Sequence, residues 1–402
     1  MSGAVEELRR FLATSLPDGW IAAAEAGDHA TVRRLRHDLD IRAFVATLGA
    51  AGWVTPHWPV EHGGRGEDEG TARAAFDLLD RWSVPRVPRG VGLVLAAPAI
   101  RAFASEATKR LLLPPIVTGR QQWAQLFSEP NAGSDLASLA TSAVRDGDGW
   151  VVNGQKVWTT LGHEADVGML LARTDPAAPK HRGITYFGLD LHTPGVEVRP
   201  LVQMTGETEF SEVFLTGVVV PDLHRISAVN EGWAATHTSL SAERVNLSGP
   251  TTRQRASRGI LGGKTVDEVL ALAAAVGAAA DPVRRDHVAT AYVESRLLTL
   301  TVERSAAGRQ AGPAGSITKI SKARSNQALQ ELAMELRGAA AQAWVDGDAE
   351  AAGYVREFLR TRANSIEGGT SEIQRNIVGE RVLGLPPEPD PWKGRPWKDV
   401  PR

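Results

Sequence analysis

A change in the spacing of apolar residues at positions 121–173 constrains the fold of this chain more than any other feature. Before this segment the apolar residues recur at helical spacing. From Thr141 onward they alternate in short runs of Val, Trp, Thr and Leu, which is typical of half-buried strands. The pattern therefore predicts a β region with helices on both sides.

Two turn signals lie inside this β region, at Asp146-Gly147-Asp148-Gly149 and at Asn153-Gly154. Asn-Gly between two apolar runs is a strong hairpin signal, because both central residues of such a turn need a positive φ. We therefore expect an antiparallel β structure with a hairpin at Asn153-Gly154.

The segment Ser128–Asp135, with the sequence SEPNAGSD, is a loop of small residues. Backbone N–H groups in such a loop can face an anion, and Gly133 and Ser134 are candidates to hold a pyrophosphate. An ordinary surface turn is the alternative, because the same residue types form turns without any ligand. The chain has neither of the two common phosphate-binding motifs, GxxxxGK[ST] and GxGxxG after a strand.

SEPNAGSD followed by NGQKVWTT resembles the flavin-binding region of the acyl-CoA dehydrogenase family, in the family's order and spacing. Further similarity lies at Gly52-Trp53 with residues 58–66 (WPVEHGGRG) and at residues 367–376 (EGGTSEIQRN). Together the motifs span nearly the whole chain. Residues 158–173, 183–212 and 367–376 are most similar to bacterial members that act on branched or steroid side-chain thioesters.

The composition excludes several other classes of function. A length of 402 residues with 43% apolar and 23% charged residues fits a globular protein of two or three domains, and a net charge of −2 gives no basis for binding nucleic acid. Without cysteine, disulfides and thiol catalysis are excluded, and the ten histidines lack metal-ligand spacing. Neither a signal peptide nor a membrane span is indicated, because the longest apolar run, 269–280, is too short; we expect a cytoplasmic protein.

The resemblance implies a mainly α fold with a central β-domain. It predicts an N-terminal helical domain at 1–120, an antiparallel β-domain with flavin-binding loops at 121–227, and a C-terminal four-helix bundle and tail at 228–402. The residue pattern gives the same order of helix, strand and helix. The expected helices are 5–16, 41–48, 68–82, 91–104, 107–113, 236–247, 266–279, 282–309 and 317–336, and the later strands are 183–190, 196–198 and 211–220.

Three local predictions accompany this fold. Pro114-Pro115 should end the helix that begins near Ala107. Residues 63–66 (GGRG) should form a turn that caps the next helix, since no β-α-β pattern surrounds them. The tail 386–402, rich in Pro, Trp and charge, is expected to be extended and to wrap over a partner subunit.

The resemblance also assigns contacts to FAD. A Trp plane offers area for stacking, and a Thr hydroxyl can donate to a ring nitrogen. For Trp158 alone a core aromatic residue on a strand would be favoured, but its neighbours in the motif favour the flavin contact. The implied contacts are Gln125, Phe127 and Ser128 beside the isoalloxazine, Gly133 and Ser134 near the phosphates, Trp158 on the flavin face and Thr160 near N5, Gly369, Thr370 and Glu372 near the adenosine diphosphate, and Gly338 at the approach of a neighbouring subunit.

The family's reaction is α,β-dehydrogenation of an acyl-CoA thioester. A carboxylate removes the α-proton while hydride leaves the β-carbon for flavin N5, and the backbone N–H of Gly368 or its neighbour polarises the thioester carbonyl. Glu243, directly before Arg244, matches the base of the isovaleryl and long-chain enzymes. Glu367 is the alternative, one residue earlier than the base of another branch. Ser134 and Arg244 are expected to contact the substrate.

The chain departs from the family between Ser248 and Lys264, where many members carry an Arg followed shortly by Phe-Gly that reaches a neighbouring subunit's flavin. The basic residues Arg253, Arg255, Arg258 and Lys264 there either meet CoA phosphates or form a solvated loop, and the solvated loop is favoured. The acyl chain length is left open by the sequence.

Partners and alternatives follow from the resemblance. It implies a homotetramer or dimer, an acyl-CoA substrate, and an electron-transfer flavoprotein or similar acceptor. The alternatives are the same fold with different flavin chemistry or a carrier-protein thioester substrate, and a non-catalytic subunit of a mixed oligomer. The missing Arg and Phe-Gly motif leaves a mixed oligomer open.

Overall fold

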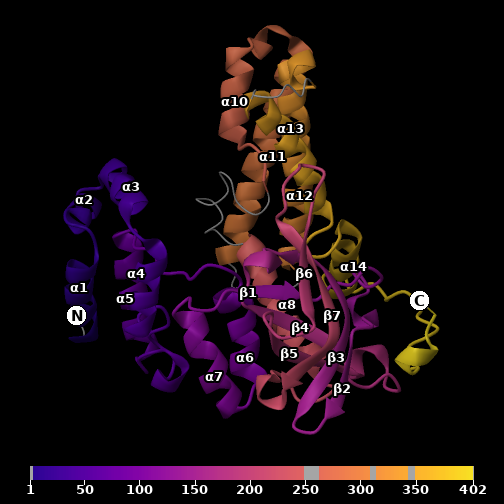
Figure 1. Ribbon diagram of the computed structural model, residues 1–402. Coiled ribbons are helices and arrows are strands. Elements are labelled where there is room, and N and C mark those ends of the chain that lie inside the picture. The colour runs from indigo at the N-terminus through magenta and orange to yellow at the C-terminus, as the bar shows by residue number, and fades with distance from the viewer. Residues whose placement is uncertain (1–2, 249–261, 308–313, 343–348, 402) are drawn as a thin grey trace. The chain divides into compact units, whose positions relative to one another are not determined.

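The computed structural model describes residues 3–248, 262–307, 314–342 and 349–401 (Figure 1). The chain divides into two compact units. The first comprises Met1–Pro200, Phe210–Ser239 and Gly394–Arg402, and the second comprises Leu201–Glu209 and Leu240–Lys393.

The first unit begins with seven α-helices, drawn from indigo to purple in Figure 1. Asp28, Asp40, Asp68 and Ser105 each cap a helix by accepting a hydrogen bond from the backbone N–H three residues later. The helices are α1 (Gly3–Ser15), α2 (Trp20–Glu25), α3 (His29–Asp38), α4 (Ile41–Ala50), α5 (Glu69–Arg81), α6 (Ala97–Phe103) and α7 (Glu106–Val117). The apolar spacing predicted all of these except α2 and α3.

The prediction that Pro114-Pro115 ends a helix is wrong, because α7 continues through both prolines to Val117. Proline removes a backbone donor, and Thr118 forms the end of the helix with its N–H and Oγ1 both donating to the carbonyl of Pro114. Burial of Ile116 and Val117 keeps this last turn helical. The predicted turn at residues 63–66 is confirmed, since α5 follows it with Asp68 as its cap.

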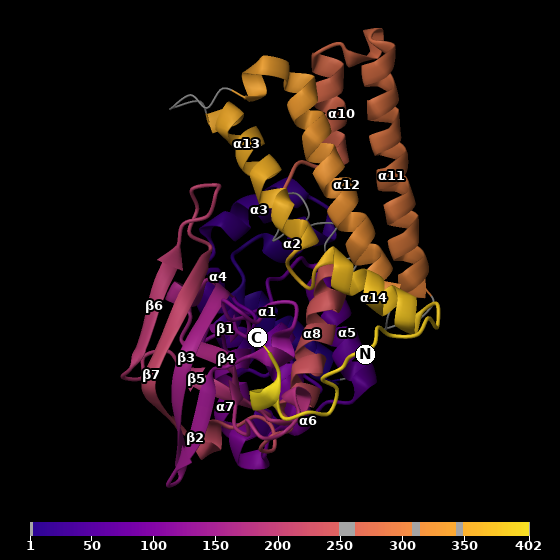
Figure 2. The ribbon, with the colours of Figure 1, turned by 90° about the vertical axis from the view of Figure 1, so that its right-hand side faces the viewer.

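A mixed seven-stranded sheet forms the second part of the first unit, as Figure 2 shows from the side. The pairs β2–β3, β3–β7 and β4–β5 are antiparallel, as predicted, but β1 and β2 both run parallel to β4. The strand order is β1-β4-β2-β3-β7-β6, with β5 also paired to β4. The strands are β1 (Trp123–Leu126), β2 (Ser142–Asp146), β3 (Gly149–Thr160), β4 (Val167–Arg173), β5 (Ile184–Asp190), β6 (Val196–Leu201) and β7 (Phe210–Pro221).

The hairpin predicted at Asn153-Gly154 is wrong. β3 is one strand of twelve residues, and the tight turn lies before it, where Asp146 pairs with Gly149. Asn153-Gly154 is instead an irregularity in the β3–β7 register. A Cβ at Gly154 would lie 2.7 Å from the Cα of Thr141, so glycine is needed here because two backbones approach closely.

The second unit consists mainly of helices. Its described helices are the C-terminal part of α8 (Gly232–Ser248), α10 (Val266–Ala275), α11 (Pro282–Ala307), α12 (Ala314–Arg337), α13 (Ala349–Thr361) and α14 (Ser371–Arg381). In Figures 1 and 2 the helices α10 to α13 lie side by side, which agrees with the predicted bundle. Val269, Leu332 and Leu336 form its buried core with Tyr354.

The C-terminal tail returns to the first unit. Trp397 is buried there, and its backbone N–H donates to the carbonyl of Ala178 at 2.9 Å. The expectation that the tail wraps over a partner subunit is therefore corrected for residues 394–401, which pack on the chain's own β-domain. In the part of the chain that the structure describes, no helix is long and apolar enough to cross a membrane.

Candidate functional site

A buried ion pair joins the two motifs that resemble a flavin site. Lys156 of NGQKVWTT is fully buried, and its Nζ donates to the carboxylate of Glu129 of SEPNAGSD at 2.8 Å. The same ammonium donates to the carbonyl of Phe127 at 3.1 Å. The backbone N–H of Ala140 donates to Oε2 of Glu129 at 2.7 Å, and that of Thr141 donates at 2.9 Å to Oε1, the oxygen that also accepts from Lys156. The loop and the strand are thus held as one element.

The electrostatics of this pair favour a charged carboxylate. Burial alone would raise the pKa of Glu129, but the charge of Lys156 and the surrounding donors hold that pKa below its ordinary value. Burial lowers the pKa of Lys156, while Glu129 opposes the shift. Each group depends on the other, since a single charge at this depth would have no counter-charge.

A bulge in β3 adds a third link between the motifs and turns Trp158 outward. The β3–β7 register shifts between Lys156 and Thr159, and the N–H of Val157 donates to the carbonyl of Ser128 at 3.0 Å. Trp158 has a φ of 61°, which is unusual for a bulky residue. Its side chain is 59% exposed and meets Phe210 edge to face at 5.7 Å. An indole held open in this way is a platform for a planar ligand.

The loop residues assigned to the phosphates are exposed on one side and anchored on the other. Gly133 and Ser134 are exposed, and a Cβ at Gly133 would meet no atom within 4 Å. Asp135 pairs with Lys180 at 2.9 Å and accepts from the Oγ of Ser138 at 2.6 Å. The loop is therefore anchored at Asp135, while the backbone at Gly133 remains open.

The residues assigned to the isoalloxazine end lie on or directly after β1. Gln125 is half-buried in β1, opposite Met169 of β4. Phe127 is buried against Tyr186, ring centroid to ring centroid 5.7 Å, and its carbonyl is the one that Lys156 contacts. Thr160 is exposed at the end of β3. The first unit thus gathers the predicted residues of both β-domain motifs.

In the second unit, the turn before α14 presents two consecutive glycines with positive φ, Gly368 at 64° and Gly369 at 89°. Thr370 caps α14 by accepting from the N–H of Ile373, and Glu372 is exposed in the first turn. Gly338, with a φ of 61°, begins the short helix Gly338–Ala341. A helix N-terminus after a glycine turn is suited to an anion.

The two candidate bases differ in what the structure shows of them. Both oxygens of Glu367 are engaged: Arg360 donates to Oε1 at 3.2 Å and to Oε2 at 3.0 Å, and Asn364 donates to Oε1 at 2.9 Å. Glu243 and Arg244 lie in α8, as predicted, and their side chains lie outside the described part of the chain. The assignments of Glu243, Glu367, Gly368 and Arg244 stay predictions.

Of the basic residues between α8 and α10, the structure describes only Lys264. Its Nζ pairs with Glu357 at 3.1 Å and lies 4.1 Å from the ring centroid of Tyr354. The alternatives for Arg253, Arg255 and Arg258 lie outside the described residues.

Sequence reasoning missed the Lys156–Glu129 pair and Arg360. Lys156 in the middle of an otherwise apolar strand pattern was a usable signal for the first, because a buried lysine requires a counter-charge. No local pattern indicates that Arg360 reaches Glu367, since the two residues are joined by a turn whose path the sequence does not specify.

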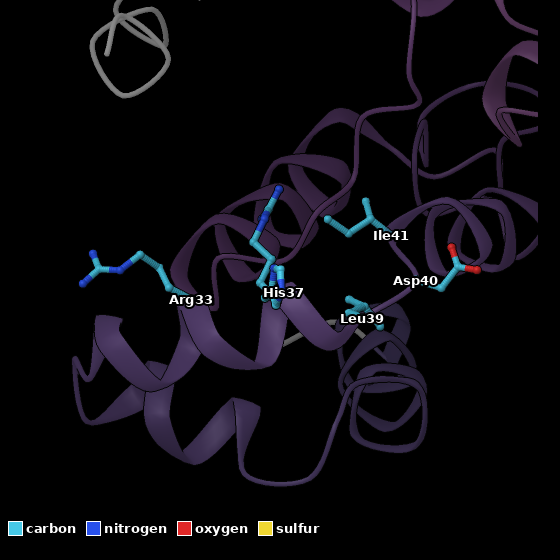
Figure 3. Close-up of a pocket in the computed structure, with 6 residues that line it drawn as sticks. Arg33, His37, Leu39, Asp40 and Ile41 are labelled. Atoms are coloured by element: carbon cyan, nitrogen blue, oxygen red, sulfur yellow. The ribbon is translucent and has the colours of Figure 1, made fainter. Parts of the chain in front are cut away.

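A hollow of about 620 Å³ at the junction of α3 and α4 is a separate feature, shown in Figure 3. None of the predicted site residues lines it; the lining residues are Arg33, Arg36, His37, Leu39, Asp40 and Ile41. Among the described residues, no group of three or more His, Cys, Asp or Glu side chains is placed to hold a metal ion.

Three successive parts of the chain match the three domains of one family. Residues 5–120 match the acyl-CoA dehydrogenase N-terminal domain, residues 124–218 the middle domain, and residues 230–383 the C-terminal domain. Acyl-CoA dehydrogenase IpdE1 of Mycobacterium tuberculosis is 37% identical over 380 residues, which cover 92% of this chain and 96% of that protein. The chain belongs to the acyl-CoA dehydrogenase family.

Further matches are also to acyl-CoA dehydrogenases. FadE34 of Mycobacterium tuberculosis is 38% identical over 350 residues, and the match covers 84% of this chain but only 45% of FadE34. A solved structure titled Tcur3481-Tcur3483 steroid ACAD matches with a TM-score of 0.70 at 27% identity, covering 96% of this chain and 99% of that one. The ChsE4-ChsE5 complex from Mycobacterium tuberculosis matches with a TM-score of 0.66 at 27% identity, covering 97% and 99%.

Membership of the acyl-CoA dehydrogenase family confirms the predicted fold, the cofactor FAD and acyl-CoA dehydrogenation as the reaction. The residues present fit a flavin: Trp158 offers an exposed ring and Gly133 an open backbone, and both stand on the motifs that Lys156 and Glu129 join. The chain is an FAD-dependent acyl-CoA dehydrogenase.

The ion pair yields a prediction about stability. Glu129→Gln leaves the ammonium of Lys156 buried without a counter-charge, so the free energy of unfolding in urea should fall by about 3–5 kcal/mol. The double variant Glu129→Gln/Lys156→Met should lose less than Glu129→Gln alone, because it leaves no unpaired charge. Glu197→Gln, which breaks the exposed pair with Arg199, is the control and should leave the free energy of unfolding nearly unchanged. Equal losses for Glu129→Gln and Glu197→Gln would contradict the assigned importance of the buried pair.

Proposed function

We propose that this acyl-CoA dehydrogenase oxidises a bulky acyl-CoA thioester of the branched or steroid side-chain class. The observation that carries the flavin chemistry is the pair of motifs joined by Lys156 and Glu129, which presents Trp158 and Gly133 outward. The substrate class is supported by the solved relative titled steroid ACAD. Relatives named for isovaleryl-CoA and cyclohexane-1-carbonyl-CoA, each 31% identical over 52% of this chain, support a branched or cyclic acyl group.

The chain's own residues bind, orient and deprotonate the substrate. FAD, when bound, supplies the hydride acceptor beside Trp158 and Thr160, with Gln125, Phe127 and Ser128 lining the ring. Gly133 and Ser134 face its phosphates, and Ser134 also contacts the thioester ligand. The backbone N–H of Gly368 or its neighbour donates to the thioester carbonyl, which increases the acidity of the α-proton. A carboxylate then accepts that proton.

We assign the proton transfer to Glu243. A helix such as α8 fixes the backbone of this residue and limits the directions of its side chain. Glu367 is the weaker candidate because Arg360 and Asn364 already occupy its oxygens. Arg244, next to Glu243 in the sequence, is assigned a contact with the substrate.

Glu243→Gln should therefore lower kcat by about two to four decades, because a positioned general base contributes that much to the rate. The flavin absorption spectrum should stay unchanged, since the substitution leaves the cofactor contacts in place. Glu367→Gln is the matched control and should lose far less activity, with its main cost in stability. Steady-state kinetics of both variants check this; a large loss only in Glu367→Gln would move the base to the turn before α14.

The substrate class is tested with a panel of acyl-CoA thioesters added anaerobically to the FAD-loaded protein. Bulky branched or steroid side-chain thioesters should bleach the flavin absorption near 450 nm faster than straight-chain thioesters of equal carbon number. Electrons then pass to an electron-transfer flavoprotein or similar acceptor, and an artificial acceptor dye reports turnover. A preference for straight chains would refute the proposed class, and bleaching only by carrier-protein thioesters would refute CoA as the carrier.

We further propose that the active form contains at least two chains. The helix α11 leaves a run of large apolar side chains exposed within the described chain: Tyr292 at 48%, Val293 at 52%, Leu297 at 57% and Leu300 at 52%. An apolar face of this kind marks an interface between chains. Solved relatives are titled as pairs of polypeptides, which supports either a homo-oligomer or a mixed one.

Light scattering of the FAD-loaded protein checks the number of chains. We expect a dimer or tetramer, and Leu297→Asp should reduce the mass toward that of one chain because a charge at the interface costs free energy. A stable FAD-loaded monomer of full activity would refute assembly.

A further inference from the structure

The last residues of the chain reach the loops that flank the flavin motif. The N–H of Trp397 donates to the carbonyl of Ala178 at 2.9 Å, and the N–H of Lys398 donates to that of Pro176 at 3.1 Å. Pro396 and Pro179 form an isolated bridge in the same place. The segment 394–400, called the clasp below, thus lies along the loop between β4 and β5.

The indole of Trp397 has a second contact, on the other side of the site loop. Its Nε1 donates to the carbonyl of Ser138 at 3.2 Å. Ser138 ends the short helix Leu136–Ser138, which directly follows Gly133, Ser134 and Asp135. The clasp therefore touches both the β4–β5 loop and the base of the loop assigned to the flavin phosphates.

Arg173 lies beneath this indole and holds the same two loops. Its guanidinium is 4.6 Å from the ring centroid of Trp397, and the residue is only 3% exposed. One nitrogen donates to the carbonyl of Lys180 at 2.8 Å, and another donates to Ala137 at 2.6 Å and Leu139 at 3.2 Å. Stacking a guanidinium on an indole fixes the plane of the guanidinium and hence the direction of these hydrogen bonds.

The burial pattern supports a role at this location. Residues 381–395 are all exposed, and Trp397 is then 8% exposed. The backbone and indole contacts that are described for Trp397 fall on the loops around Arg173.

We propose that the clasp positions the flavin-phosphate loop, with Trp397 as a positioning residue that acts through Arg173 and Ser138. The inference rests on the proposed assignment of Gly133 and Ser134 to the phosphates of FAD. Trp397 contacts neither substrate nor cofactor. It limits the motion of the loop, so that less ordering of the loop is required when FAD binds.

The test uses the full-length protein with Trp397→Ala, Trp397→Phe and, as control, Leu383→Ala, which removes a side chain that is 66% exposed before the clasp. The FAD dissociation constant is measured by equilibrium dialysis, and amide hydrogen exchange is followed in residues 131–141 and 174–183. Trp397→Ala should raise the dissociation constant about tenfold through loss of the stacking and the hydrogen bond. Trp397→Phe keeps a ring over Arg173 without the N–H donor, so its effect should be smaller, and Leu383→Ala should change neither measurement.

Local loosening distinguishes positioning from a general loss of stability. In Trp397→Ala, exchange should accelerate in 131–141 and 174–183 and stay at the wild-type rate in β5. An unchanged dissociation constant for FAD would overturn the inference, and so would faster exchange across the whole β-domain.

A separate pair of variants tests the assignment on which the clasp depends. Gly133→Asp and Gly133→Asn have the same size and differ in charge, so Gly133→Asp should weaken FAD binding more if phosphates lie there. If this pair behaves as expected and Trp397→Ala does not, the clasp alone is wrong. If Gly133→Asp and Gly133→Asn bind FAD equally well, the phosphate assignment fails and the clasp inference fails with it.

Discussion

The flavin-binding part of this protein depends on one buried ion pair. Lys156 and Glu129 lie on different sequence motifs, and the pair holds a strand and a loop that share no regular backbone ladder. The carboxylate of Glu129 also accepts hydrogen bonds from the backbone N–H groups of Ala140 and Thr141. Because a lone charge at this depth would be costly, the two motifs must form together. The spacing between SEPNAGSD and NGQKVWTT is therefore a structural requirement of the β-domain as well as a family signature.

The same arrangement explains how an apolar side chain comes to be exposed where a cofactor needs it. Val157 gives its N–H to Ser128 instead of to β7, so the strand bulges and Trp158 takes a positive φ. Strain of this kind persists only where neighbouring contacts hold the backbone, and here the buried side chains of Lys156 and Thr159 lie on either side. The exposed indole is thus a consequence of the pairing of the two motifs.

The sequence predicted the order of the elements better than their local geometry. Apolar spacing identified most of the helices because it reports which face is buried, but α7 passes through two prolines because burial of Ile116 and Val117 outweighs the lost donors. Asn153-Gly154 led to a wrong hairpin prediction because turn signals depend only on neighbouring residues. Glycine is needed at position 154 because Thr141 approaches closely, and this contact between strands leaves no local pattern in the sequence. Glu129 and Lys156 lie within SEPNAGSD and NGQKVWTT, but the sequence did not predict that they pair, because only the folded chain brings them together.

The contacts of Glu367 show why a glutamate near the expected position is not by itself evidence for a catalytic base. Glu367 lies next to Gly368, but Arg360 and Asn364 direct its oxygens toward α13 and the short helix after it. This pairing fixes the turn that precedes α14 and leaves Gly368 and Gly369, both with positive φ, to shape the backbone there. Within the motif EGGTSEIQ, Glu367 is thus bound to Arg360 and Asn364 beside the turn that the two glycines shape. A base on a helix, as assigned to Glu243, separates proton transfer from the turn, so that the two functions place no competing demands on one carboxylate.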